Sequence, residues 1–325
     1  MIDRNPGCEL DLGWINKVNV NFSAVNEHAA SFQQSRPLKD EYQAAWLLRA
    51  LTCIDLTTLG GDDTDSNVSR LCYKAAKPLP SDVLLALGFN YDDILQPIRT
   101  AAVCVYPSKV DVAVATLKKI GLYHKINVAS VATGFPSGQM PLRTRLDEIK
   151  YAVEMGATEI DIVIDRSLVL TAQWEKLYQE IQQMKEACGQ NAHMKTILAV
   201  GELGNLNNVY KASLVAMMAG SDFIKTSTGK ESLNATIPFG IVMCRAIREY
   251  QRKAGYKVGL KPAGGIRTAK DALAWLVLVR EELGKDWCYP DLFRIGASGL
   301  LGDIERQLFH YTTKTYAALH EFNMA

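Results

Sequence analysis

The chain has 325 residues and is 48% hydrophobic, which is enough to bury one large α/β domain or two ordinary ones. Its 36 Lys and Arg residues nearly balance 35 Asp and Glu residues, so no overall charge favours nucleic acid or an anionic membrane. The N-terminus lacks the apolar core of a signal peptide, and no stretch approaches a membrane span. We therefore expect an intracellular, cytoplasmic protein.

Cysteine and histidine spacing argues against a disulfide framework and against a tightly held metal. The seven cysteines contain no CxxC pair, and the five histidines show neither HxH nor HxxxH spacing. This pattern fits a reducing compartment. We expect no metal site and no cofactor.

The first 45 residues precede the regular pattern of strands. We expect residues 1–45 to form added helices outside the main domain, with one helix over residues 39–50. Residues 46–325 are expected to form that domain, and we see no second catalytic domain.

Eight β-branched and apolar runs follow, with helical stretches between them. Two of these stretches, 142–156 and 172–188, carry apolar residues three and four apart, as amphipathic helices do. Near-continuous apolar strands that alternate with helices indicate a parallel sheet covered on both sides, and eight such units close a (β/α)8 TIM barrel. The predicted strands are 51–59, 101–107, 126–133, 159–164, 194–200, 222–228, 258–264 and 292–298.

A doubly wound open sheet is the rival architecture. Such a sheet normally places a GxGxxG turn after its first strand, and LTTLGGDDTDSN at 56–67 does not match. KTSTGKE is not a phosphate-binding P-loop either, because it lacks the first glycine and has Glu231 where Ser or Thr should stand. The barrel is therefore favoured.

Charged residues late in apolar strands are the candidates for chemistry, because barrel active sites lie at the C-terminal strand ends. Asp55, Asp161, Lys225 and Lys261 fit this description, and Cys104 lies on the second strand. An unpaired charge is costly to bury, so each must face the lumen or form a salt bridge. A lysine becomes a nucleophile when burial or a neighbouring cation lowers its pKa, and Lys261 is such a neighbour for Lys225.

The segments FIKTSTGK, LKPAGGIRTAKDALAWL, IDLTTL, AAVCVYP, ATEIDIVI and FRIGAS together resemble the motifs of the deoxyribose-phosphate aldolases. The resemblance covers roughly residues 50–305, and the long N-terminus is similar to that of the animal form. It implies a TIM-barrel class I aldolase of deoxyribonucleotide catabolism. Such an enzyme splits 2-deoxy-D-ribose 5-phosphate into D-glyceraldehyde 3-phosphate and acetaldehyde.

The resemblance also implies catalytic roles. Lys225 matches the Schiff-base lysine, Lys261 the second active-site lysine, and Asp161 the carboxylate that moves protons. From the residues alone, Lys225 could instead pair with a carboxylate, and Lys261 could form a salt bridge to Asp161 while still acting on Lys225. Asp165 has the same strand parity as Asp161, but only Asp161 falls within EIDIV. Glu159 is interpreted as a structural or rim residue.

Two further matches concern the pocket. Asp55 matches an acidic residue that lines the family's pocket, although capping or pairing within the IDLTTL turn explains it equally well. Cys104 matches a pocket cysteine, and a small buried apolar role is the simpler interpretation.

A phosphorylated substrate needs an anion site, which barrels often build from the loops after strands seven and eight. Gly264, Gly265 and Ser298 are the candidates there, and Lys230 matches a family lysine near the phosphate, with a solvated surface lysine as the alternative. Gly299 departs from the family, which commonly has a second serine at this position. Its backbone N–H group remains available.

A second departure concerns tyrosine. Bacterial members finish with a tyrosine that assists proton transfer, and no residue here matches it. Tyr311 and Tyr316 are attributed to helix packing.

The competing functions are another Schiff-base aldolase of the transaldolase type and a sugar-phosphate-binding barrel without turnover. Beyond a small-molecule substrate no partner is predicted, and a homo-oligomer stays open.

Overall fold

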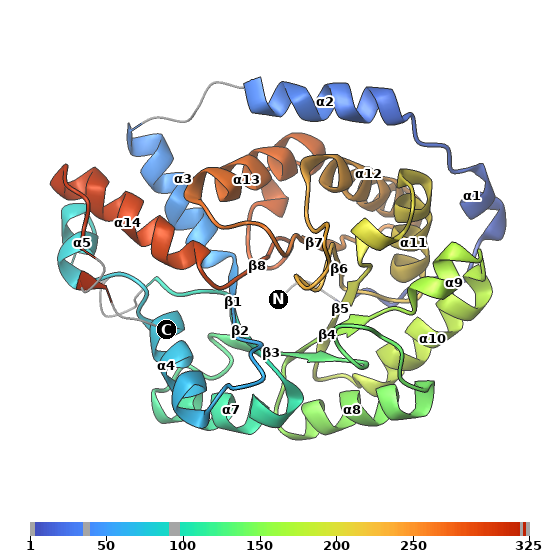
Figure 1. Cartoon of the computed structure of the whole chain (residues 1–325), viewed down its shortest axis with the longest axis horizontal. Helices are drawn as coiled ribbons and strands as arrows, with labels where there is room; N and C mark the ends of the chain where they lie inside the picture. Colours follow the sequence, from blue (N-terminus) through green and yellow to red (C-terminus); the bar gives the residue numbers. More distant parts are fainter. Residues whose placement is uncertain (1–3, 35–39, 91–97, 319–320, 323–325) are drawn as a thin grey trace.

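Eight short parallel strands form a ring at the centre of the molecule, and helices surround it (Figure 1). The computed structural model describes residues 4–34, 40–90, 98–318 and 321–322. Neighbouring strands pair in the order β7-β6-β5-β4-β3-β2-β1-β8, and bridges from Leu260 to Phe293 and from Ala263 to Gly296 close the ring. The strands are β1 (Ile54–Thr57), β2 (Ala102–Val105), β3 (Asn127–Ala132), β4 (Glu159–Val163), β5 (His193–Ile197), β6 (Phe223–Lys225), β7 (Gly259–Lys261) and β8 (Ile295–Ala297).

The (β/α)8 prediction is confirmed, and the doubly wound alternative is wrong, because the sheet closes on itself. Each predicted strand is present but shorter than its apolar run. The ends of the runs turn into loops and single helical turns, such as the 3-10 turn Pro107–Lys109 directly after β2. Apolar runs continue beyond the paired residues because the adjoining turns are also buried.

Side chains cap the N-termini of some of the helices, whereas others begin without a side-chain cap. The Thr268 side chain accepts a hydrogen bond from the Asp271 N–H, Asp271 reciprocates, and Gly284 follows the last turn of that helix. No helix among the described residues is long and apolar enough to cross a membrane. The helices are α1 (Leu12–Lys17), α2 (Phe22–Gln34), α3 (Asp40–Thr52), α4 (Asp65–Ala76), α5 (Ser81–Ala86), α7 (Val110–Lys119), α8 (Leu142–Glu154), α9 (Arg166–Leu170), α10 (Trp174–Ala187), α11 (Leu206–Met218), α12 (Ile237–Ala254), α13 (Ala269–Leu283) and α14 (Leu300–Thr313).

The main apolar core lies between the outer faces of the strands and the helix ring. Successive helices pack on one another, for example α11 on α12 and α12 on α13. A fully buried aliphatic or aromatic side chain there contributes about 1.5–3 kcal/mol. A second, small apolar cluster of Ala102, Cys104, Ala129 and Val131 fills part of the lumen between β2 and β3. The lumen also holds buried charged side chains.

The N-terminal residues cover the outside and one end of the barrel. Helices α1 and α2 run along α11 to α13, and α3 packs on α13 and α14 (Figure 1). The helix predicted over 39–50 corresponds to α3. The division at residue 45 falls inside α3 and stays a prediction. Ahead of α1, buried Asn5 donates to the carbonyls of Met217 and Ser221 and accepts from the hydroxyl of Tyr250.

Candidate active site

Strand register turns the charged residues of the lumen to the same face of the sheet, with Lys195 two residues deeper than Lys225, whose partner on β5 is Ile197. Asp161 of β4 pairs with Lys195 of β5, and Lys225 of β6 pairs with Lys261 of β7. Residues paired in register on neighbouring strands point to the same face of the sheet. The four side chains therefore enter the lumen together.

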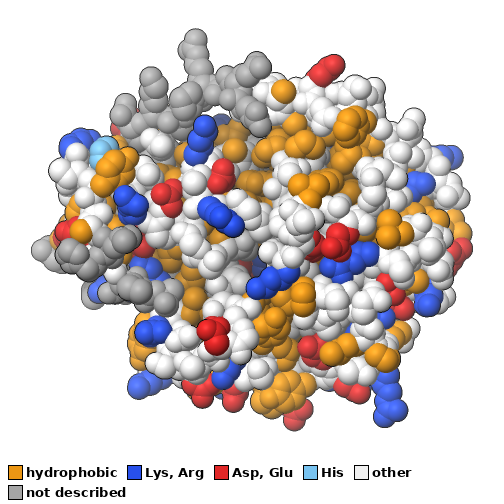
Figure 2. Space-filling model, in the orientation of Figure 1, with side chains coloured by type: hydrophobic (Ala, Val, Ile, Leu, Met, Phe, Trp, Pro, Cys, Tyr) orange, Lys and Arg blue, Asp and Glu red, His pale blue; other side chains and the backbone are white. Residues whose placement is uncertain are grey.

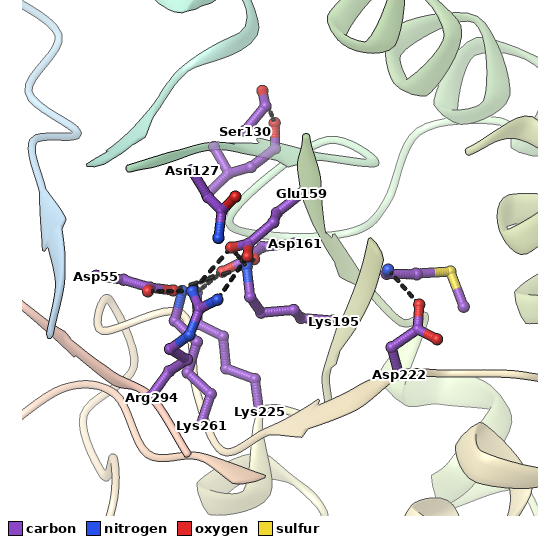
Figure 3. Close-up of polar contacts among 12 residues, drawn as sticks. Asp55, Asn127, Ser130, Glu159, Asp161, Lys195, Asp222, Lys225, Lys261 and Arg294 are labelled. Atoms are coloured by element: carbon purple, nitrogen blue, oxygen red, sulfur yellow. Dashed lines mark hydrogen bonds and ion pairs between the residues drawn. The ribbon is translucent and has the colours of Figure 1, made fainter. Parts of the chain in front are cut away.

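Asp161 lies at the centre of this group and accepts hydrogen bonds from three lysines (Figure 3). Its Oδ2 is 2.7 Å from both Lys225 Nζ and Lys261 Nζ, and its Oδ1 is 3.0 Å from Lys195 Nζ. Burial alone would raise the pKa of Asp161, but the three ammonium groups outweigh it and hold that pKa well below its usual range. Asp161 is an ionised acceptor.

A second layer of charge lies deeper in the lumen. Arg294 Nη1 is 2.7 Å from Asp55 Oδ1, and Arg294 Nη2 is 2.6 Å from Glu159 Oε1. Lys261 also donates to Asp55, and Lys195 donates to Glu159. The lumen cluster thus contains three carboxylates and four cations, namely Asp55, Glu159, Asp161, Lys195, Lys225, Lys261 and Arg294.

The lumen cluster holds one more cation than it has carboxylates, and Lys225 has the fewest partners. Lys261 and Arg294 each contact two carboxylates and Lys195 contacts three, whereas Lys225 contacts only Asp161. Burial and the charge of Lys261 lower the pKa of Lys225, although Asp161 opposes them. Burial works against charged Lys261, yet Asp161 and Asp55 raise its pKa. Lys225 is therefore the amine that loses its proton most readily.

A pocket of about 370 Å³ opens above Lys225 at the C-terminal ends of the strands. Lys and Arg side chains lie around the middle of the face seen in Figures 1 and 2. A cavity of about 430 Å³ at the opposite end of the barrel is lined by Glu159 and Arg294, and not by Lys225. The pocket above Lys225 is lined by residues at the C-terminal ends of β1, β6 and β8 and in the loops after β1, β6, β7 and β8: Thr57, Thr58, Leu59, Gly60, Lys225, Thr228, Gly229, Lys230, Ala263, Gly264, Gly265, Ile266, Arg267, Gly296, Ala297, Ser298 and Gly299.

All five residues predicted for phosphate binding line this pocket. Gly264 and Gly265 have φ of 81° and 83°, a left-handed conformation that favours glycine. Lys230 is exposed, and its Nζ lies 3.5 Å from the Leu59 carbonyl oxygen. Ser298 and Gly299 lie directly before α14, whose N-terminus adds unpaired N–H groups. The pocket therefore combines a lysine with loop amides and a helix start.

The other predicted residues lie outside the pocket lining. Asp55 is part of the lumen cluster, while Cys104 is buried in the small apolar cluster, and burial raises the pKa of its thiol. Asp165 does not reach the lumen. It caps α9 by accepting from the Ser167 N–H at 2.9 Å. Glu159 is structural rather than a rim residue, because it is buried under Arg294.

Tyr311 and Tyr316 also lie outside the pocket lining. Tyr311 is partly buried at the end of α14. Tyr316 lies beyond that helix, where it is 56% exposed and stacks on His310 with ring centroids 4.3 Å apart. Tyr311 therefore packs as part of α14, and Tyr316 packs against α14 from outside it, on His310 and Arg306.

Three charged residues of the site were not predicted. Lys195 and Arg294 belong to the lumen cluster, and Arg267 lines the pocket. Lys195 and Arg294 interrupt apolar strands, which is the signal that identified Asp161. Arg267 lies in a glycine-containing loop, where a charged residue is common, so its sequence context does not mark it as functional.

A TIM barrel with a pocket above a buried lysine is the arrangement of the barrel aldolases. The chain belongs to the DeoC/LacD family of aldolases, whose sequence model matches residues 49–298. It is 65% identical over 319 residues to the deoxyribose-phosphate aldolase of Mus musculus, covering 98% of each chain. It is 63% identical over 325 residues to the deoxyribose-phosphate aldolase of Homo sapiens, covering 100% of each.

Solved structures share the fold. A putative deoxyribose-phosphate aldolase from Toxoplasma gondii superposes with a TM-score of 0.69 over 86% of this chain and 98% of its own. The deoxyribose phosphate aldolase from Aeropyrum pernix gives a TM-score of 0.60 over 86% of this chain and 100% of its own. Both are 23% identical to this chain, so they establish the fold alone.

Proposed function

We propose that this chain is a class I aldolase that cleaves 2-deoxy-D-ribose 5-phosphate into D-glyceraldehyde 3-phosphate and acetaldehyde. Relatives that carry the name deoxyribose-phosphate aldolase match the whole chain at 63–65% identity. The observation that carries the mechanism is the excess cation of the lumen cluster, because it favours a neutral Lys225 at the base of the pocket.

The first step is imine formation at Lys225. Its neutral amine attacks the C1 aldehyde carbon, and the resulting carbinolamine loses water to give an iminium. A proton must reach the departing hydroxyl, and Asp161 with its bound ammonium groups lies beside the reacting nitrogen. General acid–base help of this kind typically contributes about 10²–10⁴-fold.

The second step breaks the bond between C2 and C3. The C3 hydroxyl loses its proton toward Asp161 through a water, the C2–C3 electron pair moves into the iminium, and glyceraldehyde 3-phosphate leaves. The enamine left on Lys225 takes a proton at carbon and is hydrolysed to acetaldehyde. Lys261 stays charged between Asp161 and Asp55 and keeps Asp161 in place.

The phosphate group would lie at the rim of the pocket. Lys230 and Arg267 supply positive charge, and the N–H groups at Gly264, Gly265 and the start of α14 supply donors. Arg267 has no ion-pair partner among the described residues. These groups lie on loops beside Lys225, so one sugar phosphate can span both parts of the pocket.

The compartment is also part of the proposal. The seven cysteines are all free, and six of them are buried. Free thiols are typical of proteins in reducing compartments, which supports a cytoplasmic location.

Product analysis tests the proposed reaction. We expect the protein to release acetaldehyde and glyceraldehyde 3-phosphate from 2-deoxyribose 5-phosphate in equal amounts, as followed by NMR, and the K225M variant to release neither. Transfer of a three-carbon unit without acetaldehyde would indicate a transaldolase-type enzyme instead. Binding of the sugar phosphate without turnover by folded protein would indicate a non-catalytic barrel.

A further inference from the structure

The side chain of Arg166, the first residue of α9, joins loops that follow four neighbouring strands. Its Nη2 donates to the Pro136 carbonyl at 3.0 Å, and its Nη1 donates to the Ser137 carbonyl, both in the loop after β3. Its Nε lies 2.8 Å from Glu202 Oε2, after β5. Its Nη2 lies 3.7 Å from Glu231 Oε1, after β6. The Arg166 side chain is only 12% exposed and that of Glu231 only 2%, whereas that of Glu202 is 47% exposed, so the contact with Glu231 is the ion pair best shielded from water.

The carboxylate of Glu231 in turn binds the backbone of the turn that precedes it. The Thr228 N–H donates to both carboxylate oxygens at 3.0 and 3.1 Å, and the Gly229 N–H donates to Oε2 at 3.1 Å. Hydrogen bonds to a carboxylate are stronger than those between neutral groups. Thr228, Gly229 and Lys230 all line the pocket above Lys225. Glu231 therefore fixes the backbone that carries Lys230.

The same turn also reaches the glycine loop after β7. Asn234 Nδ2 donates to the Glu231 carbonyl at 2.7 Å. The Asn234 side chain packs directly on Gly264, where an added Cβ would lie 2.6 Å from Asn234 Cγ. Arg166 and Glu231 thus connect to two of the three segments that we propose for phosphate binding, those after β6 and β7, although neither residue lines the pocket.

Charge makes the two residues interdependent. The side chain of Glu231 is 2% exposed and places a negative charge behind a pocket that must accept a phosphate. Without a cation beside it, this carboxylate would be costly to bury and would repel the substrate. Arg166 supplies that cation. Arg166 also ties the turn to the loops after β3 and β5.

We propose that Arg166 and Glu231 are positioning residues that hold the turn at 228–231, and with it Lys230, in the geometry that binds the phosphate of the substrate. This inference rests on the proposed function. It assigns the pair to phosphate affinity and not to the chemical step, because neither residue contacts Lys225 or Asp161.

The test compares R166M and E231Q with a matched control. Arg145 and Glu180 form another buried pair, 2.8 Å apart, which joins α8 to α10 outside the pocket lining. R145M therefore measures what the loss of a buried arginine does to the enzyme in general. Each variant is assayed on 2-deoxyribose 5-phosphate and on unphosphorylated 2-deoxyribose.

We expect R166M and E231Q to raise the KM for the phosphorylated sugar by about tenfold while kcat changes by less than about threefold, as lost substrate binding does. The kcat/KM for unphosphorylated deoxyribose should change by less than about threefold. Inhibition by inorganic phosphate should weaken in parallel. The double variant should lose less than the product of the single effects, because the two residues act as one unit.

The inference is wrong if R166M and E231Q keep the wild-type KM, if E231Q binds the phosphorylated sugar more tightly, or if both substrates suffer equally, as expected for R145M. If R166M fails to fold, R166K takes its place, because lysine keeps the positive charge but lacks the planar guanidinium group that contacts several loops at once. The same KM, kcat and phosphate-inhibition measurements then apply. Failure of the proposed function is distinguishable, since wild-type protein would then release no acetaldehyde.

Discussion

The reactivity that we propose for Lys225 depends on how four cations share three carboxylates. Lys195, Lys261 and Arg294 each bind at least two acidic side chains, whereas Lys225 shares the single carboxylate of Asp161. If one of the four cations gives up a proton, losing it from Lys225 therefore costs the least free energy. In the proposed mechanism, the excess of cations over carboxylates makes Lys225 nucleophilic as much as its desolvation does.

Removing one competing cation should reverse this effect. In K261M the lumen cluster has equal numbers of cations and carboxylates, so Lys225 keeps its proton more firmly and its pKa rises. The acid limb of kcat/KM against pH, which requires neutral Lys225, should move to higher pH. A limb that stays in place or moves to lower pH would contradict the charge-counting account. If K261M turns over too slowly, the pH dependence of borohydride trapping gives the same information.

The sequence predicted part of this cluster for a physical reason. Asp161, Lys225 and Lys261 stand out because unpaired charges are excluded from apolar strands. Lys195 and Arg294 meet the same criterion, but they lie before the C-terminal ends of their strands, where barrel active sites are expected. Their long side chains reach up the lumen from deeper positions. Which residues pair with a buried charge depends on strand register, which the sequence alone does not give.

At the level of elements, the turns after β6, β7 and β8 form the end of the pocket that we propose to bind phosphate. Gly264 and Gly265 both have positive φ, but their surroundings differ. A Cβ at Gly264 would meet the side chain of Asn234, whereas a Cβ at Gly265 has nothing within 4 Å. Only the first glycine is required for steric reasons as well as for its backbone conformation.

This difference predicts unequal effects of alanine. Both G264A and G265A incur a left-handed backbone cost of about 1–2 kcal/mol. G264A must also displace Asn234 and the turn bonded to it, so its KM for 2-deoxyribose 5-phosphate should rise by at least about tenfold more than that of G265A. Steady-state kinetics on both variants provides the measurement, and equal KM values would show that Asn234 does not support the loop.

Gly299 offers the opposite experiment. Its φ is −79°, and a Cβ there would have nothing within 4 Å, so serine fits without strain. The added hydroxyl supplies one more donor beside the proposed phosphate site. G299S should lower the KM for the phosphorylated sugar by about two- to tenfold, the worth of one net hydrogen bond. An unchanged KM, with unchanged inhibition by inorganic phosphate, would place the phosphate away from α14.

The loops were harder to predict than the strands. The glycines and Lys230 could be named from motifs, but the bridging role of Arg166 depends on where four loops meet in space. Asp165 illustrates the same point. It has the strand parity of Asp161, yet β4 ends at Val163 and Asp165 caps the next helix. A shift of a few residues in a strand end decides which carboxylate reaches the lumen.

Across the whole molecule, the ion pairs of the lumen cluster also join strands on different sides of the barrel. Asp55 lies on β1, Glu159 and Asp161 on β4, Lys195 on β5, and Arg294 directly precedes β8. Removing one partner of a buried ionic group leaves the other charge uncompensated. The charges that tune Lys225 are therefore also structural.

Glu159 tests the structural side of the lumen cluster. Burial would raise its pKa, but Arg294 and Lys195 lower that pKa below the usual value. Its contribution to stability is therefore present above the unfolded-state pKa of about 4.3 and is lost as the pH falls below it. E159Q should destabilise the protein by about 3–5 kcal/mol at pH 7 and by less near pH 3, as measured by urea unfolding.

The control for E159Q is D286N at the exposed pair of Lys257 and Asp286, 3.1 Å apart, which should cost less than about 1 kcal/mol. A difference between E159Q and wild type that does not depend on pH would contradict the linkage argument.

The central claim, that Lys225 forms the imine, is tested most directly by borohydride reduction during turnover of 2-deoxyribose 5-phosphate, followed by peptide mapping. We predict a single substrate-dependent adduct on Lys225 Nζ, either the reduced sugar phosphate or an ethyl group from acetaldehyde, together with loss of activity. K225M should form no adduct. An adduct on Lys261 or another lysine, or an unmodified Lys225 in protein that still cleaves the substrate, would contradict this account.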